Sequence, residues 1–134
     1  MRVYLDTSAA VKLLVAEPES AALTAQLDQP GLHVVSSDLL ETELGRVAVR
    51  GGLPASDVAT VLSRIDLATP DRSTYRHAAW LSHPTLRSLD ALHIAAAIGL
   101  NADAILTYDQ RMIDACHALG VSVLTPLPDG TPAA

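Results

Sequence analysis

The chain has 134 residues, of which 49% are apolar and 18% are charged, and its formal net charge is −6. This length suits one domain with a substantial core, and the composition excludes an intrinsically disordered chain. The single cysteine, Cys116, excludes both an internal disulfide and a cysteine-rich zinc site, which is typical of a reducing compartment. Because the neighbours of Cys116 indicate a helix, we expect its thiol to pack in the core.

Targeting signals are not expected in this chain. The N-terminal apolar run of MRVYLDTSAAV is broken by Asp6, so we expect no signal peptide. The longest apolar stretch, Ala91 to Leu100, is too short to span a bilayer. We therefore expect a cytoplasmic protein without membrane contact. The negative charge disfavours nucleic acid as a partner unless acidic side chains are gathered around a divalent cation.

The predicted elements alternate between strands and helices along the chain. In chain order we predict a strand at 3–5, helices at 8–16 and 18–27, a strand at 33–36, helices at 38–50, 54–65, 75–81 and 88–100, a strand at 104–106, a helix at 110–119 and a strand at 121–124. The strands are short apolar runs, which favours an α/β fold with a short parallel sheet flanked by helices on both faces. We expect a domain over residues 1–125 and a flexible C-terminal tail over 126–134.

Two aspartates follow predicted strands. Asp6 comes directly after the first strand, and Asp109 follows the strand at 104–106 through Thr107. Functional sites in parallel sheets form beyond the carboxyl ends of the strands, but an aspartate in that place is also a natural helix N-cap. Thr7 or Ser8 can cap the first helix instead, which would leave Asp6 free. Thr107 is likewise placed to support the backbone near Asp109.

Glu43 lies on the apolar stripe of its predicted helix, at i+3 from Leu40 and i−4 from Val47. An inward-facing carboxylate is costly unless it is paired or bound to a metal. The nearby Glu41 has capping-box spacing from Asp38, which we predict to be the N-cap. We therefore assign a structural role to Glu41 and a functional role to Glu43.

Asp90 lies in the first turn of the strongly apolar helix predicted at 88–100. Two interpretations remain open: it favours the positive end of the helix dipole with Ser88 as the cap, or it faces a central site. Carboxylates about 4 Å apart repel by roughly 4 kcal/mol at an effective dielectric constant near 20. A hard cation such as Mg²⁺ or Mn²⁺ relieves this repulsion and can activate water against a phosphodiester.

Four segments carry these acids in order: VYLDTSAAVKLL, VSSDLLETEL, LRSLDALHIAAA and ILTYDQRM. Together they resemble the PIN-domain ribonucleases and, within these, the VapC-type toxins of bacterial toxin–antitoxin pairs. The resemblance runs from Arg2 to about Leu124. Its pattern, like the helix stripe, selects Glu43 rather than Glu41.

The resemblance implies a PIN fold and a Mg²⁺- or Mn²⁺-dependent endoribonuclease that is the toxin of a type II pair. It assigns catalysis and metal binding to the same four residues: Asp6, Glu43, Asp90 and Asp109. It implies that Thr7, Ser8 and Thr107 orient these carboxylates. It also implies an RNA substrate cleaved to leave a 5′-phosphate, a homodimer, and an antitoxin whose C-terminal segment covers the groove.

Arginines on the predicted surface are candidates for contact with RNA. Arg46 and Arg50 lie four residues apart on one helix, and Arg87 precedes the apolar helix. A solvated surface is the alternative for each of them.

Two further side chains have open assignments. His93, at i+3 from Asp90, is expected to be a satisfied buried histidine, with contact to the site as the alternative. Trp80 is expected in the core or at a dimer interface. The same interface is a candidate location for three apolar residues: Leu13, Leu14 and Val15.

Other classes of acidic α/β protein fit less well. A receiver domain needs adjacent acids after the first strand and a late lysine, whereas the only lysine here is Lys12. A haloacid-dehalogenase-type phosphatase needs a second aspartate where Ser8 stands. The remaining alternative is a catalytically silent PIN-fold module that binds RNA or protein, and the four intact acids argue against it.

Overall fold

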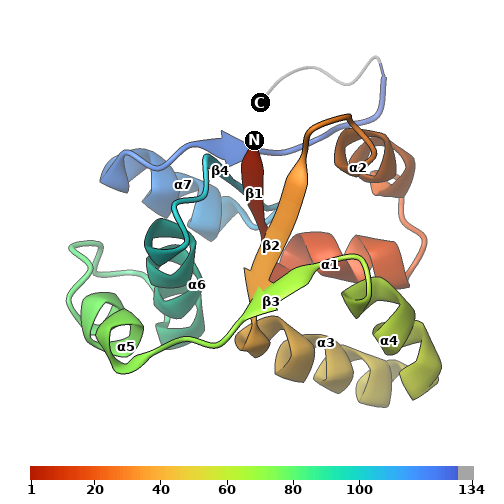
Figure 1. The fold of residues 1–134 in the computed structure, drawn as a ribbon, viewed down its shortest axis with the longest axis horizontal. Helices are drawn as coiled ribbons and strands as arrows, with labels where there is room; N and C mark the ends of the chain where they lie inside the picture. Colours follow the sequence, from red (N-terminus) through yellow and green to blue (C-terminus); the bar gives the residue numbers. More distant parts are fainter. Residues whose placement is uncertain (130–134) are drawn as a thin grey trace.

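Five short parallel strands form one sheet in the order β3-β2-β1-β4-β5 in the computed structural model, which describes residues 1–129. β1 (Arg2–Leu5) lies at the centre between β2 (His33–Ser37) and β4 (Ala104–Leu106). β3 (Asp66–Ala68) and β5 (Val123–Leu124) are the edge strands (Figure 1). The predicted parallel α/β architecture is therefore confirmed.

Helices cover both faces of this sheet (Figure 1). The first group comprises α1 (Thr7–Leu14), α2 (Ser20–Leu27), α3 (Asp38–Gly51) and α4 (Ala55–Leu62). The second comprises α5 (Arg72–Ala79), α6 (Ser88–Gly99) and α7 (Gln110–Leu119). No helix within residues 1–129 is long and apolar enough to cross a membrane.

The central strand is buried on both faces because alternate side chains of a strand point in opposite directions. Val3 and Leu5 join the core cluster of the α1–α4 side. Tyr4 joins the opposite cluster, with residues such as Ile94 and Met112 from α6 and α7. Small alanines of α6 complete the packing: Ala96 and Ala97 lie in the cluster with Tyr4, and Ala91 and Ala95 pack with Ala78 of α5. The buried Cys116 thiol of α7 confirms the expected core position.

The strand β3 was not predicted, and the preceding helix was predicted too long. α4 ends at Leu62 rather than at Ile65. The chain then turns, buries Ile65 in the core, and pairs Asp66 with Val35 of β2. A three-residue edge strand that begins with an exposed aspartate has no apolar run that could identify it in the sequence.

Two of the predicted helix caps are wrong. Ser37, not Asp38, occupies the N-cap position of α3, and Asp38 instead accepts a hydrogen bond from Thr69 Oγ1 at 2.7 Å. The capping box with Glu41 is therefore not formed. At α6 the N-cap position is occupied by Arg87 rather than by Ser88.

The helix α5 begins at Arg72, earlier than the predicted Tyr75. Its N-cap is Asp71, whose side chain accepts the Thr74 N–H at 3.0 Å. A cap of this kind satisfies an N–H group that the first turn leaves without a helical partner. The start of this helix thus lies between the helices predicted at 54–65 and 75–81, where no element was predicted.

Trp80 is 84% exposed, so the prediction of a core position is wrong, and a dimer interface stays a prediction. Leu13 and Leu14 pack partly against the core, and Val15 is 38% exposed. Of the predicted tail, residues 126–129 contain no helix or strand, and residues 130–134 lie outside the described residues.

The first prediction concerns the core around α3. Leu44 is fully buried, so Leu44→Ala should lower the free energy of unfolding by about 3 kcal/mol, through lost transfer energy and the cavity left behind. Val49 lies on the same helix but is 65% exposed, and Val49→Ala should change it by less than about 0.5 kcal/mol. Urea unfolding of both variants measures the difference, and equal losses would contradict the assignment of faces on α3.

Candidate active site

The predicted acids gather at the carboxyl-terminal edge of the sheet. Asp6 follows β1 directly, and Asp109 follows β4 and is the N-cap of α7. Glu43 lies on α3, the helix that follows β2. Asp90 lies in the first turn of α6. Two strand–helix connections, the second turn of α3 and the start of α6 thus bring the four carboxylates to one side of the molecule.

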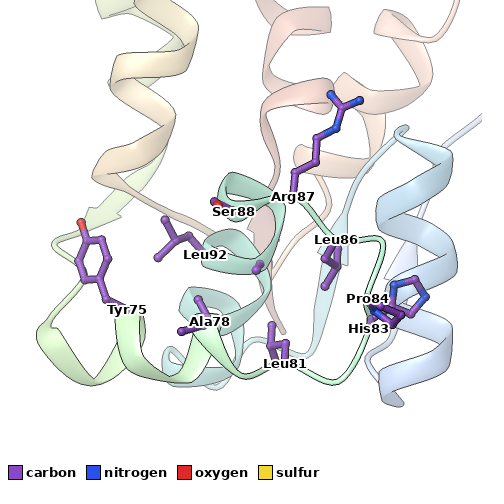
Figure 2. Close-up of a pocket in the computed structure, with 11 residues that line it drawn as sticks. Tyr75, Ala78, Leu81, His83, Pro84, Leu86, Arg87, Ser88 and Leu92 are labelled. Atoms are coloured by element: carbon purple, nitrogen blue, oxygen red, sulfur yellow. The ribbon is translucent and has the colours of Figure 1, made fainter.

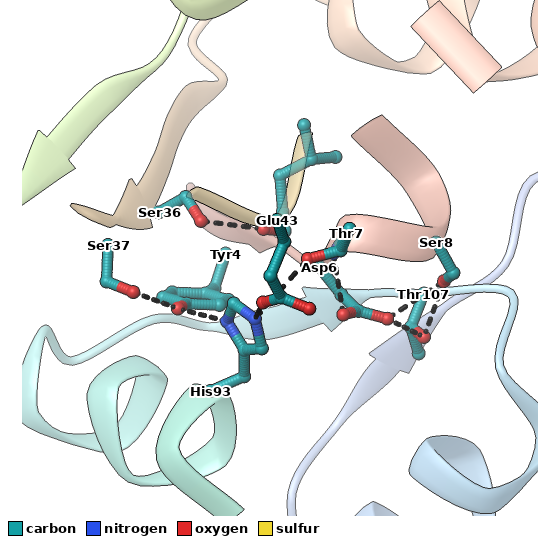
Figure 3. A network of polar contacts seen from close by, with 10 residues as sticks. Tyr4, Asp6, Thr7, Ser8, Ser36, Ser37, Glu43, His93 and Thr107 are labelled. Atoms are coloured by element: carbon teal, nitrogen blue, oxygen red, sulfur yellow. Dashed lines mark hydrogen bonds and ion pairs between the residues drawn. The ribbon is translucent and has the colours of Figure 1, made fainter. Parts of the chain in front are cut away.

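Asp6 is only 4% exposed, and both its carboxylate oxygens accept hydrogen bonds (Figure 3). Oδ1 accepts the Thr7 N–H at 2.6 Å, which makes Asp6 the N-cap of α1. Oδ2 accepts the hydroxyl of Ser8 at 2.8 Å and that of Thr107 at 2.6 Å. The idea that Thr7 or Ser8 caps this helix and frees Asp6 is therefore wrong: Asp6 is both the cap and a member of the acidic group.

The two hydroxyls that hold Asp6 are oriented by the backbone after β4. Tyr108 donates its N–H to Ser8 Oγ at 2.9 Å, and Asp109 donates its N–H to Thr107 Oγ1 at 3.1 Å. Each hydroxyl therefore accepts from the backbone and has its proton available for Asp6. The predicted role of Thr107 in supporting the backbone near Asp109 is confirmed, and the same hydroxyl connects this segment to Asp6.

Glu43 is paired with His93, a contact that the sequence left as an open alternative. His93 is 1% exposed, and its Nε2 lies 2.5 Å from Glu43 Oε1. Its Nδ1 lies 2.7 Å from the hydroxyl of Tyr4, whose pKa burial raises to about 12, so that the phenol stays protonated. Both alternatives for His93 thus hold, because the side chain is buried and satisfied and also reaches the acidic group.

Burial and hydrogen bonding act in opposite directions on the pKa of Glu43. Burial raises this pKa, but the hydrogen bond and charge of His93, together with a hydrogen bond from Thr7, lower it by more. The net pKa lies below the ordinary value, so Glu43 is ionised at neutral pH.

The pKa of Asp90 is raised, first by burial and then by the negative charges of Asp109 and Asp6. His93 opposes this effect, and Glu43 adds to it. The acids therefore share one electrostatic environment in which the charges repel one another.

The donor set fits a hard divalent cation, because it consists of carboxylate oxygens whose mutual repulsion such a cation would relieve. The type of ligand atom suits such a cation, but the side chains do not form a complete coordination site. Within residues 1–129, no three His, Cys, Asp or Glu side chains are close enough to form a ready metal site.

A groove of about 420 Å³ begins beside Glu43 and runs along α3. Its lining comprises Thr7, Leu39, Thr42, Glu43, Arg46, Val47, Arg50 and Leu89. Arg46 and Arg50 thus line the same groove as Glu43. Arg87 lines a separate pocket between α5 and α6, where its side chain extends away from the apolar residues (Figure 2).

Comparison with known proteins gives a consistent picture. The profile of the PIN domain matches residues 3–118. Ribonuclease VapC35 of Mycobacterium tuberculosis is 42% identical over 133 residues, which covers 92% of this chain and 96% of that protein. Ribonuclease VapC46 of the same species is 39% identical over 127 residues, covering 92% and 97%.

Solved structures share the fold at low sequence identity. Mycobacterium tuberculosis VapC20, described as a sarcin-ricin loop cleaving toxin, superposes with a TM-score of 0.73 at 16% identity, covering 92% of this chain and 99% of that one. VapBC2 from Rickettsia felis, bound to a DNA fragment from its promoter, gives 0.74 at 17% identity, covering 92% and 98%. A toxin–antitoxin complex from Klebsiella pneumoniae gives 0.71 at 16% identity, covering 92% and 97%.

The second prediction follows from the electrostatic repulsion between Asp90 and Asp109. Asp109→Asn should lower the pKa of Asp90, because one of the negative charges that raise it is removed. Carboxyl NMR titration of the metal-free protein measures this pKa. Asp114→Asn is the matched control, because Asp114 lies on the same helix and is exposed, where it accepts from Gln110.

Stability gives an independent measure of the same effect. A carboxyl whose pKa is raised by folding stabilises the folded state at low pH, and this contribution is lost as the pH rises through the raised pKa. Asp90→Asn should therefore raise the melting temperature at neutral pH relative to the wild type, and this gain should shrink on acidification. A pKa of Asp90 unaffected by Asp109→Asn would contradict the shared environment.

Proposed function

Because the chain belongs to the PIN domain family, we propose that it is a metal-dependent endoribonuclease that acts as the toxin of a type II toxin–antitoxin pair. The observation that carries this proposal is the placement of Asp6, Glu43, Asp90 and Asp109 at the carboxyl-terminal edge of the sheet. The charges of Asp109, Asp6 and Glu43 contribute to the raised pKa of Asp90, which supports this placement. The relatives named as VapC ribonucleases support the reaction class.

In this proposal Asp6, Glu43, Asp90 and Asp109 hold Mg²⁺ or Mn²⁺, directly or through water. The bound cation would supply an activated water and balance the charge of the phosphate. Hydrolysis would form a bond from the water oxygen to phosphorus and break the bond to the 3′ oxygen. That oxygen would take up a proton, so that the products are a 3′-hydroxyl and a 5′-phosphate.

The residues around the acids have positioning roles in this scheme. Ser8 and Thr107 hold Asp6 through Oδ2, and the Thr7 N–H holds it through Oδ1, so that this carboxylate has one orientation before any cation arrives. Such preorganisation is what a metal site needs from its surroundings.

One observation favours a second candidate, the catalytically silent binding module. Within the described residues, the acidic side chains do not form a group of three or more that is ready to bind a metal ion. Metal binding and cleavage, measured together, separate the two candidates.

The proposal also includes partners and location. Structural neighbours described as toxin–antitoxin complexes support a cognate antitoxin. We further propose a homodimer, a cytoplasmic location, and a domain over residues 1–125.

The third prediction tests the activity. Purified, antitoxin-free protein should cleave a mixed pool of small RNAs with Mg²⁺ or Mn²⁺ and not with EDTA. Asp6→Asn and Asp90→Asn should each lower the rate by roughly 100-fold or more, because each removes a charge that the reacting centre needs. Asp114→Asn, the exposed control, should cleave as the wild type does. Folded protein that binds Mn²⁺ but cleaves no RNA would instead favour the binding module.

The fourth prediction concerns the groove along α3. We propose that Arg46 and Arg50 bind RNA phosphates, because both line the groove that reaches Glu43, and that Arg87 makes a lesser contact from its separate pocket. In an Asp6→Asn background, Arg46→Ala and Arg50→Ala should each weaken binding of single-stranded RNA. Each should also reduce the slope of log K against log salt by about 0.7.

Fluorescence anisotropy over a series of salt concentrations measures both effects. Arg64→Ala is the matched control, because Arg64 is exposed and pairs with Asp28 away from this groove. If the control weakens binding as much as the groove variants do, the groove is not the RNA path.

A further inference from the structure

Four side chains form a connected row of polar contacts from the end of β2 to the acidic group (Figure 3). Ser37 Oγ lies 2.9 Å from the Tyr4 hydroxyl, which lies 2.7 Å from His93 Nδ1. His93 Nε2 then lies 2.5 Å from Glu43 Oε1. The first three side chains are at most 1% exposed, whereas the Glu43 side chain is 24% exposed. The row therefore begins in the interior and ends at the surface of the site.

The direction of the last hydrogen bond follows from the chemistry of its partners. An ionised carboxylate only accepts, so the Nε2 atom that faces Glu43 must carry the hydrogen. This holds whether the ring is neutral or protonated. In the neutral ring Nδ1 accepts from the Tyr4 hydroxyl, which in turn is free to accept from Ser37. Tyr4 and Ser37 thus accommodate the tautomer that donates to Glu43, and the carboxylate selects it.

His93 is the one polar side chain among the buried residues of α6. Most of its buried neighbours on that helix are apolar, such as Ile94 and Ala95. A buried imidazole is costly unless both nitrogens have partners. Here Nδ1 faces Tyr4 and Nε2 faces the Glu43 carboxylate, with Thr7 Oγ1 farther from Nε2 at 3.4 Å. A glutamate on a helix has several free torsions, which a hydrogen bond to a buried, rigid donor restricts.

We infer that His93 is a positioning residue that holds the Glu43 carboxylate in one orientation, with Tyr4 and Ser37 fixing the imidazole from behind. The role of Glu43 in binding a cation rests on the proposed function. The hydrogen bond itself does not, and it can be tested without metal or RNA.

The first experiment is a long-range ¹H–¹⁵N NMR spectrum of the metal-free protein, with the His93 signals identified by their loss in His93→Gln. Nε2 should carry a proton at neutral pH. Tyr4→Phe removes the partner of Nδ1, so it should shift the Nδ1 signal more than any other histidine nitrogen. An unprotonated Nε2, or an Nδ1 signal that Tyr4→Phe leaves unchanged, would overturn the inference whatever the protein cleaves.

The second experiment compares His93→Leu with His93→Gln. Leucine removes the donor, whereas glutamine retains an N–H group at a similar reach. His93→Leu should weaken Mn²⁺ binding by roughly 10–100-fold in isothermal titration calorimetry, and His93→Gln should recover most of that loss. In the cleavage assay the loss should fall on kcat, with KM for RNA nearly unchanged.

Two controls separate positioning from a merely structural role. Urea unfolding reports the stability of each variant, and a structural role alone would lower stability without a change in Mn²⁺ affinity. In a Glu43→Gln background, His93→Leu should have little further effect on Mn²⁺ binding, because its target is gone. If leucine and glutamine variants bind Mn²⁺ equally, the inference is wrong. If the wild type neither binds Mn²⁺ nor cleaves RNA, the proposed function fails, and the NMR experiment still decides the contact.

Discussion

The burial of the Asp6 carboxylate is the constraint on which the site depends. A buried charge is tolerated only with a full set of hydrogen bonds, and Asp6 obtains them from the start of α1 and from the end of β4. Those bonds require β1 and β4 to end at the same level, which their parallel register provides through the pairing of Leu5 with Leu106. The sheet register and the orientation of one carboxylate are therefore parts of the same arrangement.

The acids of the site are treated differently by their surroundings. Asp6 is held by hydroxyl and backbone donors, and Glu43 by an imidazole, so each has a favoured orientation. Asp90 has its pKa raised by burial and by its acidic neighbours, so the fold disfavours the charged form of this carboxyl. Repulsion between buried charges is typical of functional sites, where it lowers the stability of the free protein and is relieved when a ligand binds.

Overall acidity and RNA binding are compatible in this arrangement. The net charge is −6, but four of the acidic residues stand at one edge of the sheet, where a cation would offset them. The groove along α3 places Arg46 and Arg50 beside Glu43, so that positive and negative groups adjoin on one surface. In the proposed function, the two arginines would attract the phosphate backbone to the groove that Glu43 also lines.

The α/β alternation, the parallel sheet, the bounds of α7 and the four acids could be predicted from the sequence, because hydrophobic period and strand-end position are local properties of the chain. Features that depend on partners distant in the sequence could not be predicted in this way. The edge strand β3 exists only through its pairing with β2, Asp38 turns to Thr69 instead of capping α3, and Trp80 remains exposed. The contact between His93 and Glu43 joins residues 50 positions apart, and only the packing of α6 and α3 around the end of the sheet brings them together.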